Sequence, residues 1–249
     1  MATPRPRYIG ASEVAALFDA HPYMTHFQLW HIKAGNIAKP PFASTDRSFW
    51  GDVIEPSVAR GFCKLHGYDL IELDDEQRFR VHPTIPQCCA NLDYMFTHAA
   101  RGDNSLLECK TVDYISFRDS FPNGNLPLHY ELQLQQQMMC TNIGEGTVAV
   151  LIGGNELREF HRDYRDSVAN CIETAINDFW QSIRENKPPA PSYARDGKAL
   201  AWLMRERDGR TGDWRGNNYL NNLCADYLRY AEAESAAKKA KEQAKAEII

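Results

Sequence analysis

The sequence lacks any apolar run close to the ~20 residues that a membrane-spanning helix needs. Its first residues also lack the apolar stretch of a signal peptide. The seven cysteines are odd in number and scattered, without the repeated spacing of a zinc or iron–sulfur site. We therefore expect a protein of the reducing cytoplasm, where disulfides are rare.

An excess of positive charge is also missing, because 28 basic and 33 acidic residues give a net charge of −5. This balance disfavours a protein that coats nucleic acid without specificity. It does not exclude a nuclease, because a metal site adds carboxylates and a DNA channel needs only local positive charge. The 249 residues, 43% of them hydrophobic, suit one globular domain with a small appendage.

A carboxylate and an ammonium lie two residues apart in a segment that has the pattern of a buried strand. Residues 106–112 are apolar at Leu107 and Cys109. Because side chains alternate along a strand, Glu108 and Lys110 point to one face and Cys109 to the other. This pattern favours a divalent metal held beside a catalytic ammonium. The alternative is a solvated ion pair on an exposed sheet face, because E-x-K alone has many chance matches.

A second carboxylate precedes this strand. Residues 89–96 also have a strand pattern, and residues 101–104 contain turn-forming types. A hairpin centred near residues 101 and 102 would place Asp93 opposite Lys110 and diagonal to Glu108. Two carboxylates and a lysine would then converge, as in metal-assisted hydrolysis, and their hard oxygen ligands favour Mg²⁺.

The remaining elements alternate between helices and short strands. Helices are expected at residues 12–18 with Ser12 as N-cap, 25–34, 47–66, 128–140 and 165–185. Further strands are expected at residues 69–73, 77–81, 147–152 and 157–161. This order predicts an α/β fold with a central mixed β-sheet flanked by helices.

The clearest boundary is the proline-rich stretch 187–191. It divides the chain into a domain of residues 1–191 and a helical C-terminal extension of residues 192–249. The extension should contain a short charged helix at 195–208 and a long Ala/Lys/Glu-rich helix at 219–249, which buries little by itself.

Two further candidates come from helices. Pro56 lacks a backbone N–H and should kink its helix, which would expose Glu55 at the bend. The alternative is an ordinary surface glutamate. Gln133 and Gln137 share one helical face, where an amide can orient water or contact a phosphate. The alternative is a merely polar helix face.

The N-terminus offers a candidate anion site. Ser12 lies at a predicted helix start, which favours anions, and an arginine can grip a terminal phosphate in two places. Arg5 and Arg7 lie just upstream. The alternative is a loose basic terminus beside an ordinary helix cap.

Taken together, these pieces resemble the YqaJ-type viral recombinase family, the branch of the PD-(D/E)xK nucleases that includes bacteriophage lambda exonuclease. The residues that carry the resemblance occur in the family's order: Gly10-Ala11-Ser12-Glu13-Val14, Trp50-Gly51 with Glu55, Asp93, Glu108-Cys109-Lys110, and Tyr130-x-x-Gln133-x-Gln135. The resemblance spans about residues 5–166. It departs from the family at Asn91-Leu92, where proline or Ser-Pro is usual.

The resemblance implies a restriction-endonuclease-like core and a Mg²⁺-dependent 5′–3′ exonuclease on double-stranded DNA, with Mn²⁺ as a substitute. Such phage-encoded or prophage-encoded enzymes act on 5′-phosphate ends and often form ring-shaped trimers. They pass 3′ single strands to a single-strand annealing protein for recombination.

The resemblance also implies roles for the site residues. Asp93, Glu108 and the Cys109 backbone carbonyl would bind the metals, and Glu55 would complete the site. Lys110 would activate the attacking water or stabilise the transition state, and Gln133 would position the water or the scissile phosphate. Arg5 or Arg7 would hold the 5′-phosphate with Ser12.

Two other functions remain open. A different PD-(D/E)xK nuclease, such as an endonuclease, would share the metal site and also cut closed circular DNA. An inactive DNA-binding or phage assembly module would bind no metal.

Overall fold

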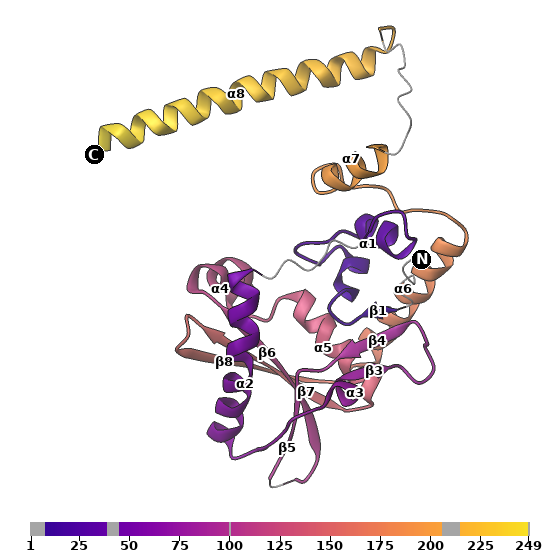
Figure 1. The fold of residues 1–249 in the computed structure, drawn as a ribbon, viewed down its shortest axis with the longest axis vertical. Coiled ribbons are helices and arrows are strands. Elements are labelled where there is room, and N and C mark those ends of the chain that lie inside the picture. The colour runs from indigo at the N-terminus through magenta and orange to yellow at the C-terminus, as the bar shows by residue number, and fades with distance from the viewer. Residues whose placement is uncertain (1–7, 39–44, 100, 206–214, 249) are drawn as a thin grey trace. The chain divides into compact units, whose positions relative to one another are not determined.

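A five-stranded mixed sheet forms the centre of the fold in this computed structural model, which describes residues 8–38, 45–99, 101–205 and 215–248 (Figure 1). The strand order is β2-β5-β6-β7-β8. Their bounds are β2 Asp69–Ile71, β5 Tyr94–Thr97, β6 Asn104–Val112, β7 Glu145–Ile152 and β8 Glu156–Asp163. The pair β6 and β7 is parallel and every other pair is antiparallel, so the predicted mixed sheet is confirmed.

The parallel pair needs a crossover, because a tight turn cannot join two parallel strands. Three helical segments supply it: α4 (Tyr114–Ser120), η2 (Pro122–Gly124) and α5 (Leu128–Thr141). Of these, α5 matches the helix expected at residues 128–140. Neither α4 nor η2 was expected from the sequence. Asp113 caps α4 by accepting a 2.8 Å hydrogen bond from the Ser116 backbone N–H.

The central strand β6 is buried on both faces. Leu106 belongs to a core that includes α5, whereas Leu107 and Cys109 belong to a second core that includes α2 (Asp46–His66). The close approach of α5 depends on Gly146 in β7, because an added Cβ would lie 2.8 Å from Cδ1 of Leu134. Helices therefore cover both faces of the sheet (Figure 1).

A second, three-stranded sheet lies beside the first, in the order β1-β4-β3. Its strands are β1 Ile9–Gly10, β4 Cys88–Asn91 and β3 Phe79–Val81. The single strand predicted at residues 89–96 is therefore wrong. The chain leaves β4 at Asn91 and enters the other sheet at Tyr94, and Leu92 between them is buried. The Asn91-Leu92 departure from the family pattern falls at this break.

The long helix α2 matches the helix expected at residues 47–66. Thr45 and Ser48 form a reciprocal capping box at its start, and Gly67 ends it in the left-handed conformation at φ +67°. The helix continues through Pro56. Three other helices are α1 His26–Lys33, α3 Asp75–Arg78 and α6 Asp166–Arg184, of which α1 and α6 were expected.

Two local expectations are wrong. Ser12 does not cap a helix, because the 3₁₀ helix η1 (Val14–Phe18) begins after Glu13, and no side chain caps it. The strand expected at residues 77–81 begins only at Phe79. The preceding residues form α3, because Asp74 and Gln77 make a capping box there.

The chain forms two compact units, Met1–Leu203 and Met204–Ile249. α7 (Gly197–Arg205) lies where the short charged helix was expected, and α8 (Asn218–Ile248) where the long one was. No side chain of α8 is buried within its unit. The predicted boundary at residue 191 stays a prediction. Among the described residues, no helix is long and apolar enough to cross a membrane.

Candidate active site

Asp93 lies at the start of β5, where the chain passes from one sheet to the other. The β5–β6 register pairs Tyr94 with Leu107 and Thr97 with Asn104, so Asp93 falls next to Glu108. The predicted position opposite Lys110 is therefore wrong by two residues. The backbone N–H of Cys109 donates a 2.9 Å hydrogen bond to Oδ2 of Asp93, which fixes one carboxylate oxygen.

Glu108 is the centre of the cluster and is only 2% exposed. Its Oε1 accepts hydrogen bonds from Nζ of Lys110 and from Nε2 of Gln133. Its Oε2 accepts a 2.6 Å hydrogen bond from Nε2 of Gln137. Strand alternation therefore places Glu108 and Lys110 together as expected, and α5 supplies two amides four residues apart on the same face.

Cys109 takes part through its backbone, while its side chain packs into the core on the α2 side. Burial, followed by the nearby Asp93 and Glu108 carboxylates, raises the pKa of its thiol well above the ordinary range. Because the Cys109 side chain points away from the face that carries Glu108, its thiol is not placed to bind a metal with the carboxylates. The role of the Cys109 carbonyl as a metal ligand remains a prediction.

Glu55 reaches the cluster from α2. It is half-buried, and the charges of Lys110 and Glu108 both act on its carboxylate. No hydrogen bond or ion pair joins Glu55 to another residue in the described part of the chain. Both of its oxygens are therefore free to accept a ligand.

The electrostatics of the cluster favour a bound cation. Burial, together with the Glu108 and Glu55 carboxylates, raises the pKa of Asp93 to about 8. Burial likewise raises the pKa of Glu55. Burial alone would lower the pKa of Lys110, but the Glu108 and Asp93 carboxylates outweigh it and raise the pKa. Three carboxylates and one ammonium thus act on one another, and a divalent cation would balance the excess negative charge.

The donor set fits a hard cation. A carboxylate has about four acceptor sites, and Asp93 and Glu108 have some of theirs free after the hydrogen bonds described above. All of the acceptor sites of Glu55 are free of hydrogen bonds from the described residues. Every available ligand atom is an oxygen, which suits Mg²⁺ or Mn²⁺ and not a thiolate-binding metal.

Two residues on α5 were not assigned roles from the sequence alone. Gln137 shares its amide between Glu108 and the Asn91 carbonyl, at 3.0 Å, and so ties the cluster to the end of β4. Tyr130 places its ring centroid 5.7 Å from Nζ of Lys110. The sequence signal for Gln137 was its spacing from Gln133. The sequence signal for Tyr130 was its place in the Tyr130-x-x-Gln133-x-Gln135 element, which gave the tyrosine no role of its own.

The predicted phosphate site at the N-terminus is only partly described. Arg5 and Arg7 lie outside the described residues. Ser12 is exposed in the turn between β1 and η1, and none of its hydrogen bonds in the described structure reaches the carboxylates. Within this turn, Oε2 of Glu13 accepts from the Gly10 backbone N–H and from Nζ of the buried Lys33.

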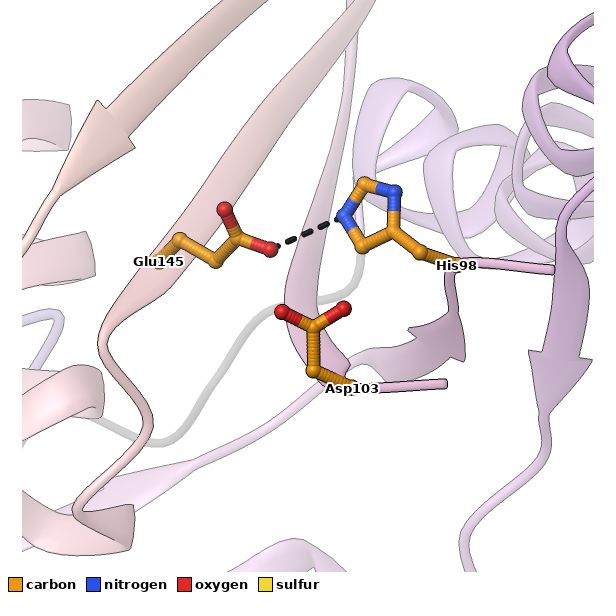
Figure 2. A group of neighbouring side chains, drawn as sticks. All are labelled: His98, Asp103 and Glu145. Atoms are coloured by element: carbon orange, nitrogen blue, oxygen red, sulfur yellow. Dashed lines mark ion pairs between the residues drawn. The ribbon is translucent and has the colours of Figure 1, made fainter. Parts of the chain in front are cut away.

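A second acidic cluster consists of His98, Asp103 and Glu145, whose ligand atoms lie within 4.8 Å of one another (Figure 2). Arg101 already pairs with both of its carboxylates, and Ser105 donates to Glu145. A metal ion would have to displace this guanidinium. The hydrogen bonds join the β5–β6 loop to β7, so we interpret the cluster as structural.

A cavity of about 790 Å³ lies between α1 and residues 193–202, with Tyr23, Ile32 and Trp202 among its walls. None of the carboxylates of the Asp93–Glu108 cluster lines this cavity. Its walls are mainly apolar, and no carboxylate of the described chain lines them to hold a metal.

Solved structures with a similar fold include an alkaline exonuclease, LHK-Exo, from Laribacter hongkongensis. It has a TM-score of 0.57 and 19% sequence identity, over 79% of this chain and 96% of that chain. A complex of LHK-Exo with dAMP has the same TM-score and identity, over 79% and 95%. A phage related exonuclease from Haemophilus somnus 129PT has a TM-score of 0.50 and 8% identity, over 72% of this chain and 96% of that chain.

These likenesses confirm the expected α/β core with helices on both faces of a mixed sheet. No curated protein matches the sequence. The family is shown by the sequence itself. One domain-family model matches residues 3–144, which are more than half of the chain. The chain belongs to the family of YqaJ-like viral recombinase domains.

Proposed function

We propose that this protein is a Mg²⁺-dependent nuclease that degrades double-stranded DNA from 5′ ends and leaves 3′ single strands for recombination by annealing. One observation carries the proposal: Glu108 pairs with Lys110, Asp93 lies beside Glu108 across the strand pair, and the charge of Glu55 acts on this group. Buried carboxylates that outnumber their positive partners do not stabilise the fold. They are suited to hold a divalent cation. Membership of the YqaJ-like family supports the same function.

The protein groups act as follows. Asp93, Glu108 and Glu55, with the Cys109 carbonyl, would hold the metal, which polarises the phosphate and lowers the pKa of a bound water. Because Lys110 stays protonated, its ammonium can stabilise negative charge as it develops on the phosphate oxygens.

Gln133 contacts the same Glu108 oxygen as Lys110. Its amide can therefore orient the water or the scissile phosphate beside that carboxylate. A positioned amide of this kind reduces the entropy lost when the reacting groups come together.

The proposal also covers how the protein binds the DNA end and how many copies assemble. Arg5 or Arg7 would grip the terminal 5′-phosphate, with Ser12 as a further donor. The same proposal includes a ring of three copies around the DNA and a single-strand annealing protein as partner. It places the protein in the cytoplasm of a phage host. Mn²⁺ would replace Mg²⁺ because it accepts the same oxygen ligands.

The test uses two DNAs in Mg²⁺: a linear duplex labelled at one 5′ end, and a covalently closed circle. The proposal expects early release of the 5′ label, single-stranded product and an intact circle. Early release of a 3′ label, in a duplicate sample labelled there, would contradict the polarity. Cutting of the circle would assign the protein to the endonucleases.

An inactive module is the remaining alternative. It would cleave neither DNA in Mg²⁺ or Mn²⁺, and neither ion would raise its melting temperature, because ligand binding to the native state is what stabilises it. A metal-dependent rise in melting temperature that Asp93→Asn abolishes would exclude this alternative.

A further inference from the structure

Arg78, at the end of α3, is fixed beside the strand break that positions Asp93. Its backbone carbonyl accepts a 3.0 Å hydrogen bond from the Leu92 N–H. The α3 capping box holds the other end of this short helix. The backbone of Arg78 is therefore tied to the segment that leads into Asp93.

The guanidinium of Arg78 is held on two sides. Its Nε donates a 3.2 Å hydrogen bond to the Leu73 carbonyl, and its Cζ lies 5.3 Å from the ring centroid of the buried Tyr94. The Arg78 side chain is half-buried, and its charge acts on Glu55. An arginine fixed in this way loses little conformational entropy when it binds a ligand.

Arg78 also differs in its partners from Lys110 and from Arg47 on α2. Lys110 pairs with Glu108, and Arg47 pairs with Asp113. Within the described chain, no carboxylate forms an ion pair with Arg78. Its charge is available for an anion from outside the protein.

We propose that Arg78 binds a backbone phosphate of the DNA strand that crosses the carboxylate cluster. The inference rests on the proposed nuclease function, because that function brings a polyanion to a patch of negative charge. The bound metal would offset part of the repulsion between the three carboxylates and the strand, and a fixed cation on the protein would offset more of it. A guanidinium is suited to this because its forked N–H groups match phosphate oxygens.

The test is equilibrium binding of a fluorescent blunt duplex in Ca²⁺, with gels to show that the DNA stays intact. It compares the wild-type protein with Arg78→Gln, Arg78→Lys and the control Arg60→Gln at several salt concentrations. Arg60 is a matched control because it is exposed on α2 and paired with Glu72 at 2.9 Å.

We expect Arg78→Gln to weaken binding about tenfold and to reduce the slope of log K against log salt by about 0.9, the value for one phosphate contact. Arg78→Lys should keep the slope and recover part of the affinity. Arg60→Gln should change neither quantity.

An unchanged slope for Arg78→Gln would overturn the proposal, even with weaker binding, because damage to the Tyr94 packing alone releases no counterions. If the wild-type protein binds and cleaves DNA while Arg78→Gln behaves identically, only the role of Arg78 is wrong. If the wild-type protein binds no duplex, the nuclease function is wrong as well.

Discussion

The amide of Gln137 joins two parts of the candidate site, because its Nε2 lies 2.6 Å from Oε2 of Glu108 and 3.0 Å from the Asn91 carbonyl. Asn91 ends β4, two residues before Asp93. The helix α5 therefore holds Glu108 and the approach to Asp93 in one arrangement. Hydrogen bonds of this kind orient metal ligands and are often as necessary as the ligands themselves.

Gln137→Leu should lower the affinity for Mn²⁺ about 10- to 100-fold and destabilise the fold by about 1–3 kcal/mol, because a buried carboxylate loses a donor. The matched control is Gln136→Leu. Gln136 is also fully buried on α5, but it donates to the carbonyls of Ile9 and Cys89. The control should lose stability and keep its Mn²⁺ affinity. Equal loss of affinity in both variants, measured by calorimetry, would contradict this role of Gln137.

Gly146→Ala should destabilise the protein by about 1–3 kcal/mol, because the new methyl group would meet Leu134 at 2.8 Å and overpack the contact between α5 and β7. Gly144→Ala serves as the control, since its added Cβ meets nothing within 4 Å. Urea unfolding of the two variants measures the difference. Equal stability would show that α5 can shift away from the sheet without cost.

Asp196 tests where the folded domain ends. It is fully buried, and its carboxylate accepts hydrogen bonds from Thr25, Gln28 and the Ser192 backbone N–H. Asp196→Ala should lower the free energy of unfolding by about 2–4 kcal/mol, because three donors lose their acceptor. Asp178→Ala, on the exposed side of α6, should leave the free energy of unfolding almost unchanged.

Truncation gives an independent measure of where the folded domain ends. A chain ending at residue 203 should melt at a higher temperature than one ending at residue 191, because only the longer chain keeps Asp196. Equal melting temperatures would favour the boundary predicted at residue 191.

His129 should make the protein less stable in mild acid. Burial, then the positive charges of His21 and Lys110, lower the pKa of His129 to about 4. In the unfolded chain its pKa is near 6.5. Between these values the unfolded state binds more protons, so stability is complete above pH 6.5 and falls as the pH drops towards 4.

Between pH 7 and pH 5.5, the protonation of His129 should lower the free energy of unfolding by about 1 kcal/mol, after allowance for partial exposure. Urea midpoints at the two pH values should therefore differ less in His129→Gln than in the wild-type protein. An NMR titration of the imidazole with a midpoint between pH 6 and 7 would contradict the prediction.

Strand periodicity predicted the centre of the site, because Glu108 and Lys110 must share a face whatever the register. The register itself depended on a loop that sequence patterns describe poorly. The loop runs from His98 to Asp103 and is closed by a 3.0 Å bond from the His98 N–H to the Asp103 carbonyl. Its centre therefore lies one residue earlier than expected, which moves Asp93 from Lys110 to Glu108.

Other features had no local signal. The break between Asn91 and Tyr94 depends on the pairing of β4 with β1 and β3, which are distant in sequence. Arg78 is an ordinary residue in its own segment, and only the folded chain brings it over the Tyr94 ring. Long-range contacts of this kind decide such features.

The central claim is that the Asp93–Glu108–Lys110 cluster is a metal-dependent nuclease site, and one measurement tests it most directly. It compares the rate of linear duplex degradation in Mg²⁺ by the wild-type protein, Asp93→Asn, Lys110→Met and Asp103→Asn. The last variant changes the other acidic cluster (Figure 2). Wild-type protein and Asp103→Asn should degrade DNA at similar rates. Asp93→Asn and Lys110→Met should be slower by about 10³-fold, or about 4 kcal/mol of transition-state stabilisation, with intact folds. Full activity in Asp93→Asn or Lys110→Met, or its loss in a folded Asp103→Asn, would contradict the claim.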